Sequence, residues 1–484
     1  MPARPLLAVL LLVTSASGLL AQRPPLQRLI ERGRHPAIRW GDFSDVQSAA
    51  QTLYRDNGWQ PLWMARGRPT RSARALLDAL ATVGDRGLRP EDYDASQLSA
   101  LAATLERGGA DVEQAVRFDA ALSIGALRLV RALALGRISA REASVRFSTA
   151  RARFDPVATV RELRGSLEPG PLLTELEPSW PQYLVLKRAL SRYRALLRDS
   201  LSWRLPRPRT SGLREGDRYA GAARLRRLLA TLGDLAPEAA APRNGDSTFS
   251  SELADGVRRF QIRQGAGTHV DGALHEASWR LLSSQFPRRI RQMELALERW
   301  RWLPRELETA GEPLVVSLPA MRLHYVARAA EPLPVGMRVS LGSGFERARP
   351  VQAEVVVLLV FRPPDRALGT VWFPTSGNPW LALHGSTAAE SYDEVAGCIR
   401  VADAELLATI LLRDRFDWPL ERIHAAMVGT KPVFVRLRRN LPLLVLYGTA
   451  VARENGQVFF YEDGFGQDQR LERQLARGYP YARW

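Results

Sequence analysis

Two residues of this 484-residue chain have the chemistry of a nucleophile and its base, Cys398 and His384. A thiol attacks an amide carbonyl as thiolate, so it needs a neighbouring group that takes its proton and later returns one. The two residues lie fourteen positions apart, the histidine at the end of an expected strand and the cysteine shortly before an expected helix. A loop of this length can bring the two side chains together.

Two neighbours of the cysteine would serve the same reaction. Gly397 leaves room for a substrate and frees backbone N–H groups to face a tetrahedral oxyanion. Arg400 would point the same way as Cys398 in an extended segment, where its guanidinium could hold a carboxylate through two hydrogen bonds. A second interpretation stays open, because a lone cysteine is usually a small buried apolar residue and a lone histidine a satisfied surface or core residue.

Composition excludes several classes of protein. The apolar fraction of 46% and charged fraction of 25% argue against global disorder, a collagen-like repeat and a polytopic membrane protein. The single cysteine excludes a disulfide framework and a cysteine-rich zinc site. No phosphate-binding loop is found, and His269, Asp271 and His275 make a poor metal-ligand set, so we expect no cofactor and no metal.

The net charge of +17 is almost entirely arginine, since Lys187 and Lys431 are the only lysines. Such a balance favours nucleic acid, an anionic membrane face or an acidic wall polymer as partner, although a GC-rich genome would produce the same bias. At the start of the chain, Arg4 precedes a short apolar run and then small residues, which is typical of a secretory signal. We therefore expect a signal peptide over residues 1–21, with an uncleaved anchor as the alternative, and export excludes nucleic acid as a partner.

The hydrophobic period divides the remaining chain. Apolar residues at three- and four-residue spacing predict helices over 73–83, 115–135 and 183–197, within one helical region. Residues 205–210, rich in proline and arginine, read as a linker, and three short helices follow. A basic amphipathic helix is predicted over 288–302. We expect its arginines to form a solvated face, or to contact phospholipid and the acidic peptides of a wall polymer. We expect Trp300 and Trp302 to dock on the domain that follows.

Beyond Pro313 the spacing of apolar residues changes from a helical period of about 3.6 residues to the two-residue alternation of strands. One helix is predicted over 404–413, with Asp403 as its N-cap. The fold class is therefore multidomain α+β, with a mostly-β C-terminal part. Strands are predicted over residues 314–318, 322–326, 337–341, 354–361, 370–373, 380–384 and 432–436.

A set of short motifs occurs in a fixed order along this half of the chain. They are ERWRWLP at 298–304, PAMRL at 319–323, ALG at 367–369, LH at 383–384, GCIRV at 397–401 and VLYGTA at 445–450. This ordered set resembles the L,D-transpeptidase family, whose catalytic domain is of the YkuD type, and in particular its long periplasmic subgroup that forms 3→3 cross-links in peptidoglycan. With the segments upstream, the resemblance covers nearly the whole chain after the signal.

The resemblance implies roles for matching residues only. Cys398 would be the nucleophile, His384 its base, the backbone carbonyl of Gly385 the group that orients the imidazole, and Arg400 a contact to the donor stem, with Gly397 beside it. The implied partner is peptidoglycan, and no cofactor is implied. The signal segment places the protein in the periplasm, and the basic helix suggests peripheral contact with the inner membrane. The implied domains are a helical scaffold (37–205), a three-helix peptidoglycan-binding domain (212–285), a linker helix (286–311), the catalytic domain (312–450) and a C-terminal extension (451–484).

The chain departs from the family pattern at two places. Val395 and Ala396 replace the Ser-His or Ser-Ser that usually precedes the Gly-Cys pair, and only residues 362–366 stand where the subgroup has a long capping insertion. These departures motivate two alternatives to a cross-linking enzyme. One is a wall-binding structural protein with an impaired catalytic domain, and the other is an L,D-carboxypeptidase in which water replaces the acceptor amine.

Overall fold

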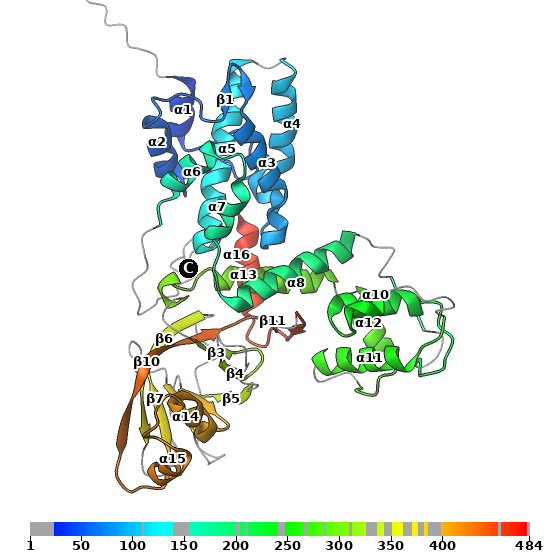
Figure 1. Cartoon of the computed structure of the whole chain (residues 1–484). Helices are drawn as coiled ribbons and strands as arrows, with labels where there is room; N and C mark the ends of the chain where they lie inside the picture. Colours follow the sequence, from blue (N-terminus) through cyan, green and yellow to red (C-terminus); the bar gives the residue numbers. More distant parts are fainter. Residues whose placement is uncertain are drawn as a thin grey trace, which may run out of the picture.

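The structure is a computed structural model in which a helical N-terminal region, three short helices and a closed β-barrel surround one central helix (Figure 1). The predicted signal segment lies outside the residues that the structure describes. Those residues are 24–108, 111–138, 154–198, 204–208, 212–240, 247–264, 269–284, 286–308, 312–325, 336–342, 351–361, 370–375, 382–385, 398–453 and 456–481.

The N-terminal region is built around α5 (Val112–Leu135), which is buried along most of its length because helices surround it. Asp119 lies fully buried on this helix, and its carboxylate accepts hydrogen bonds from the backbone N–H groups of Leu62 and Trp63 and from the Tyr54 hydroxyl. These partners replace the water that a buried carboxylate loses. The surrounding helices are α1 (Pro25–Arg32), α2 (Gln47–Arg55), α3 (Arg71–Ala81), α4 (Ala95–Glu106), α6 (Pro156–Gly165) and α7 (Pro169–Glu175).

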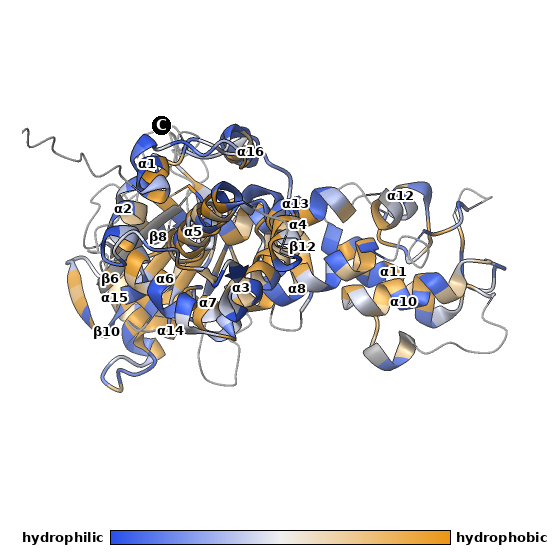
Figure 2. Cartoon of the chain, turned by 90° about the horizontal axis from the view of Figure 1, so that it is seen from above, coloured by the Kyte–Doolittle hydropathy of each residue, from blue (hydrophilic) through white to orange (hydrophobic). Residues whose placement is uncertain are grey.

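Helix α8 (Pro181–Arg198) leads from this region to the trio α10 (Ala222–Leu232), α11 (Ser251–Gln264) and α12 (Glu276–Ser284), which extends to one side of the molecule (Figure 2). The three predicted short helices are thus confirmed. In the described part of the expected linker, Leu205 is buried and its carbonyl accepts a hydrogen bond from the Trp279 indole, whereas Pro206 and Arg207 are exposed.

The C-terminal half forms a closed barrel with the strand order β10-β3-β4-β5-β9-β8-β7-β6. Neighbours are antiparallel except for the pairs β10–β3 and β8–β9. All seven predicted strands are present, but the last extends well beyond its predicted end. The eighth, Cys398–Val401, was not predicted from the sequence. The strands are β3 (Leu314–Ser317), β4 (Arg322–Tyr325), β5 (Met337–Leu341), β6 (Val351–Phe361), β7 (Val371–Pro374), β8 (Ala382–Gly385), β9 (Cys398–Val401) and β10 (Val433–Leu446).

Two helices pack on the barrel, α14 (Ala404–Leu412) and α15 (Leu420–Met427). The first is the predicted helix, and its predicted cap is confirmed, since the Asp403 side chain accepts a hydrogen bond from the N–H of Leu406 at 2.9 Å. The second was not expected from the sequence. The multidomain α+β class is consistent with this mixture of helical regions and an eight-stranded sheet.

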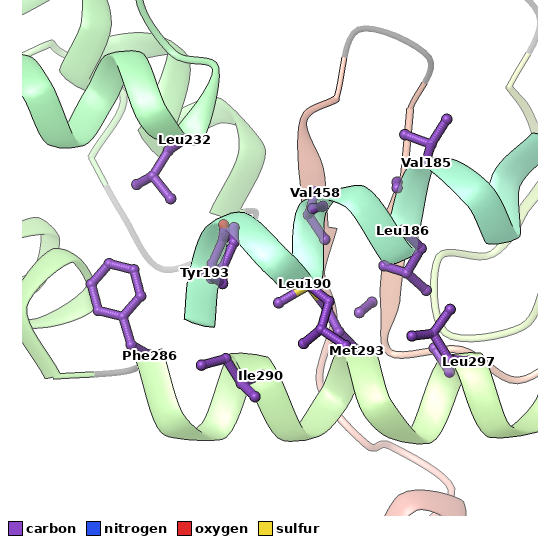
Figure 3. Packing of buried hydrophobic residues seen from close by; sticks show 14 of the residues in the cluster. Val185, Leu186, Leu190, Tyr193, Leu232, Phe286, Ile290, Met293, Leu297 and Val458 are labelled. Carbon is purple, nitrogen blue, oxygen red and sulfur yellow. The ribbon is translucent and has the colours of Figure 1, made fainter. Parts of the chain in front are cut away.

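The basic helix is α13 (Phe286–Trp300), and the expectation of a solvated arginine face was wrong. Arg289, Arg299 and the following Arg301 are buried, because acidic and carbonyl groups from distant parts of the chain surround the helix. Its apolar side packs along α8, as Figure 3 shows. This contact contributes to a core that also includes the trio and the C-terminal segment; the labelled members are Val185, Leu186, Leu190, Tyr193, Leu232, Phe286, Ile290, Met293, Leu297 and Val458.

The residues at the end of α13 join it to the N-terminal region. Glu298 accepts a hydrogen bond from the N–H of Ile138 at 3.0 Å, and the Trp302 indole donates to the carbonyl of the same residue at 2.6 Å. The Trp300 ring lies 6.2 Å from that of Trp180. Both tryptophans therefore contact the N-terminal helical region. They also belong to the buried core that includes Val315 and Leu444 of the barrel strands, so the expected docking on the following domain stays a prediction.

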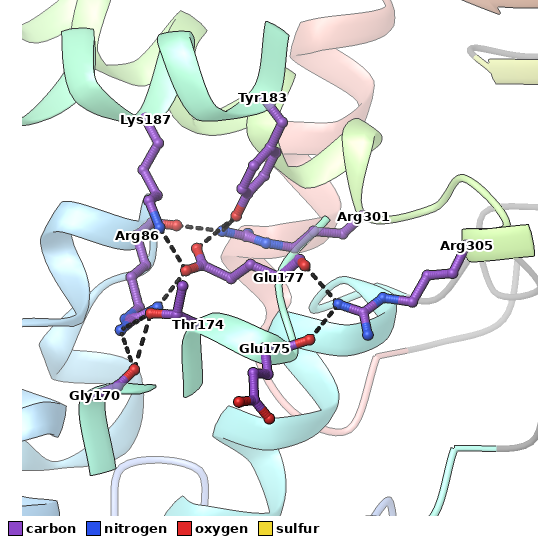
Figure 4. Close-up of polar contacts among 9 residues, drawn as sticks. All are labelled: Arg86, Gly170, Thr174, Glu175, Glu177, Tyr183, Lys187, Arg301 and Arg305. Atoms are coloured by element: carbon purple, nitrogen blue, oxygen red, sulfur yellow. Dashed lines mark hydrogen bonds and ion pairs between the residues drawn. The ribbon is translucent and has the colours of Figure 1, made fainter. Parts of the chain in front are cut away.

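Arg301 takes part in another set of contacts between distant segments, which is centred on the buried carboxylate of Glu177 (Figure 4). That carboxylate accepts hydrogen bonds from the Tyr183 hydroxyl at 2.7 Å and the Lys187 ammonium at 2.6 Å, and it pairs with Arg86. Arg301 in turn donates to the Tyr183 hydroxyl at 3.2 Å. This set of contacts thus links the loop after α3, the start of α8 and the end of α13.

The C-terminal segment packs against the central helix α13. Strands β11 (Ala450–Ala452) and β12 (Val458–Phe460) pair with each other, and α16 (Gln467–Arg477) lies against α13. The guanidinium of Arg299 pairs with Asp468 and donates to the carbonyl of Gln467 at 2.9 Å. Further on, the Tyr481 hydroxyl accepts a hydrogen bond from Arg137, so the tail reaches the N-terminal region.

This arrangement predicts that Asp468→Ala is strongly destabilising. The change leaves the Arg299 guanidinium buried without its carboxylate, and removing one partner of a buried pair costs about 3–5 kcal/mol. Glu106→Ala is the control, because it breaks an exposed pair with Arg74 that is worth about 1 kcal/mol or less. Thermal unfolding followed by circular dichroism measures both, and equal melting temperatures for the two variants would contradict the role given to Asp468.

Candidate functional site

The predicted nucleophile and base lie on neighbouring parallel strands of the barrel. Strand β8 pairs with β9 in a register that places Ala382 opposite Cys398 and His384 opposite Arg400. Because side chains alternate between the faces of a strand, His384, Cys398 and Arg400 share one face. Leu383 and Ile399 point the other way and are fully buried in the barrel.

The register also sets how far apart the residues lie. Cys398 and His384 are diagonal neighbours, one strand across and two residues along. With strands about 4.8 Å apart and a rise of about 3.3 Å per residue, their Cα atoms are separated by about 8 Å. Side chains on one face can meet across such a gap. Strand β5 holds β9 from the other side, with Gly342 N–H donating to the Cys398 carbonyl at 3.0 Å.

Burial determines the protonation of the thiol. Cys398 is 8% exposed and His384 is 3% exposed, whereas Arg400 is half-buried. Loss of solvent raises the pKa of the Cys398 thiol above its ordinary value, because burial disfavours the thiolate. At neutral pH the sulfur is therefore protonated, and attack by this residue needs a base that removes the proton during the reaction.

The helix α14 fixes the end of β8. A Cβ atom at Gly385 would lie 2.2 Å from the Cβ of Ala404, the first residue of α14, so only glycine permits this approach. The sequence suggested a different reason for Gly385, its carbonyl as the group that orients the imidazole. That role stays a prediction, while the packing gives the glycine a structural reason of its own.

A tryptophan that the sequence did not single out adjoins the base. Trp372 on β7 is the direct antiparallel partner of His384, and it is half-buried. Its neighbours Val371 and Phe373 are fully buried inside the barrel, so the indole lies on the face that carries His384. One feature of the sequence could have identified Trp372 as a neighbour of the site. It is a large aromatic residue between two core positions of a predicted strand.

Several predicted features of the site fall outside the described residues. These are Gly397, the Val395-Ala396 pair before it and the shortened segment over 362–366. In the described ranges no group of three or more His, Cys, Asp or Glu side chains could hold a metal ion. His275 instead contacts Asp271 at 2.7 Å, and its ring lies 5.7 Å from that of His269.

Gln261 and Gly272 have a structural role in the trio, the segment that the sequence predicts to bind wall polymer. The buried Gln261 side chain donates to the Ala273 carbonyl at 2.9 Å and accepts from the N–H of Gly272 at 2.9 Å. It therefore fixes the turn between α11 and α12, where Gly272 has a positive φ of 79° and a Cβ would lie 2.7 Å from the Ala254 carbonyl oxygen. Binding to wall polymer remains a prediction.

Over the ranges that the structure describes, the helices are all too short or too polar to cross a membrane.

The contact between Gly385 and Ala404 predicts a compensating pair of substitutions. Gly385→Ala should destabilise the barrel by about 1–3 kcal/mol, because the new methyl group overlaps the helix. Adding Ala404→Gly removes the opposing methyl and should restore most of the loss. Ala404→Gly alone should cost about 1 kcal/mol or less. The double-mutant cycle is measured by thermal unfolding, and strictly additive costs would show that the two residues do not touch.

Comparisons with known proteins give a coarse assignment. Residues 48–190 match the model of the Scaffold domain family, within the segment 37–205 for which the sequence predicts a helical scaffold. A search of curated proteins found no match. Among solved structures, the crystal structure of the L,D-transpeptidase (residues 123–326) from Xylanimonas cellulosilytica DSM 15894 matches with 15% identity and a TM-score of 0.16, covering 50% of this chain and 100% of that one. Similarity at this level assigns neither a fold nor an activity to the barrel, whereas the chain does carry a segment of the Scaffold type.

Proposed function

We propose that this chain is a cysteine-dependent L,D-transpeptidase that forms 3→3 cross-links between stem peptides of peptidoglycan. The observation that carries the proposal is the parallel register of β8 and β9, which puts His384, Cys398 and Arg400 on one face. The ordered motifs around these residues and the Scaffold segment upstream support the same family. Export to the periplasm and binding of wall polymer by the trio belong to this proposal.

In the proposed first half-reaction, His384 takes the proton of the Cys398 thiol as the sulfur attacks. The amide carbon between the third residue and the terminal D-Ala of a tetrapeptide stem becomes tetrahedral, with the negative charge on its oxygen. The C–N bond then breaks, the protonated imidazole gives its proton to the leaving D-Ala amine, and a thioester remains on Cys398. Arg400 would hold a carboxylate of the donor stem.

In the second half-reaction, the acyl group passes from Cys398 to the acceptor. The side-chain amine of an acceptor stem attacks the thioester carbonyl and passes a proton to His384. The C–S bond breaks, the new amide bond forms, and the sulfur recovers its proton from the imidazole. Each step balances without an oxidant, reductant or cofactor. If water attacks in place of the amine, the product is a tripeptide, and the enzyme is an L,D-carboxypeptidase.

The burial of Cys398 favours a second candidate. A thiol that is 8% exposed, with a raised pKa, also fits a structural residue in a wall-binding protein that no longer catalyses. The two candidates differ in one property, since a catalytic thiol must be able to form an acyl bond with the assistance of its base.

Acylation by a carbapenem, followed by intact-mass measurement, tests the proposal. The parent protein should gain one adduct, Cys398→Ala none, and His384→Ala should react about 10²–10⁴-fold more slowly, because it lacks the base. The residual rate of His384→Ala should rise about tenfold per pH unit up to the raised pKa of the thiol, since that variant depends on preformed thiolate.

The matched control is His424→Ala, which removes an exposed histidine of α15 that contacts Glu405 and no group of the proposed site. It should keep the adduct. An unmodified parent protein would favour the structural candidate, and equal rates for the parent and His384→Ala would remove His384 from the reaction.

A further inference from the structure

One end of the barrel exposes large apolar side chains. Phe416 is 91% exposed, Val428 76%, Phe434 72% and Leu420 47%. Residues 416–434 thus hold four of the eleven exposed large apolar side chains in the described part of the chain, within only 19 positions. Scattered apolar residues on a surface need no explanation, but a concentration of this kind marks an interaction site.

The segments that carry Phe416 and Phe434 are held to the barrel by specific contacts. The ring of Trp418 stacks on that of Phe361 at 5.3 Å with an interplanar angle of 11°, which anchors the segment between α14 and α15 to the barrel. Arg415 donates to the carbonyl of Arg436 at 3.0 Å and so holds the neighbouring Phe416 beside β10. Phe434 lies on the outer face of the same strand, because Val435 points into the core.

The same stretch of the chain is rich in basic residues. Residues 413–439 include seven basic and three acidic side chains, a net charge of +4 with histidine neutral. Two of the basic residues are paired, Arg413 with Glu312 and Arg415 with Asp417. The other basic side chains of this stretch are exposed; they are Arg422, Lys431, Arg436, Arg438 and Arg439.

This combination selects among possible partners. A polyanionic polymer would use the arginines but gain nothing from exposed phenylalanines. A second copy of the same surface would cover the phenylalanines but bring two sets of positive charge together, which is unfavourable. An anionic bilayer satisfies both, since apolar side chains enter the boundary of the acyl chains while arginines and lysine meet the headgroups.

We propose that this surface, the barrel tip (Phe416, Leu420, Val428 and Phe434 with the exposed basic residues of 413–439), docks on an anionic lipid bilayer. Figure 1 shows α15 at the end of the barrel farthest from the N-terminal helices, so a docked molecule would extend those helices away from the lipid. The sequence had suggested membrane contact through the basic helix α13, whose arginines are largely buried. The barrel tip is independent of the proposed reaction.

The test is co-sedimentation of the full chain with vesicles of phosphatidylcholine, with and without 30% phosphatidylglycerol. The protein should bind the anionic vesicles at least tenfold more strongly, and the preference should fall as salt is raised. Phe416→Ser with Phe434→Ser should weaken binding about tenfold or more, and Arg438→Gln with Arg439→Gln should weaken it while reducing the salt dependence. The matched controls, Ile262→Ser and Arg227→Gln, change exposed residues of the trio and should bind like the parent.

Folding of each variant is checked by its melting temperature, which should not change because the substituted side chains are exposed. A parent protein that stays in the supernatant would overturn the proposal, as would a double phenylalanine variant that binds like the parent. Sedimentation velocity adds one more outcome: a dimer of the parent that the phenylalanine substitutions dissociate would assign the barrel tip to self-association instead.

Discussion

The architecture depends on the burial of five consecutive residues, 298–302, at the end of the central helix α13. These five side chains are charged or aromatic, and their partners come from several distant parts of the chain. Glu298 and Trp302 hold the N–H and the carbonyl of Ile138, while Arg299 holds the C-terminal helix α16. A buried guanidinium is tolerated only with such partners, so these contacts hold the N-terminal region and the C-terminal tail to the end of α13.

This constraint gives the residues of the motif ERWRWLP a structural role. Its residues are occupied by contacts between parts of the chain. The barrel follows directly after it, and β3 and β10 add Val315, Leu444 and Leu446 to the core that α13 shares with α8. The strands that carry Cys398 and His384 are therefore held in a fixed relation to the helical region.

Much of the barrel could be predicted from the sequence, because alternation of apolar and polar residues is a local signal. The cap Asp403 and its helix were predicted for the same reason. The burial of the arginines of the basic helix could not be predicted. Their pattern in the sequence is the same whether water or a distant carboxylate such as Asp468 faces them. Strand order is equally non-local, and therefore the closeness of Trp372 to His384 appears only in the register.

The proposed site combines a buried thiol, a base on the adjacent strand and an arginine opposite that base, and its central claim is acyl transfer through Cys398. Incubation of the purified chain with a defined disaccharide-tetrapeptide, followed by mass analysis of the products, tests it most directly. Cross-linked dimer, formed with release of D-Ala and lost in Cys398→Ala, is the predicted result. Tripeptide alone would restrict the chain to hydrolysis, and recovery of unchanged tetrapeptide would contradict the proposed catalysis.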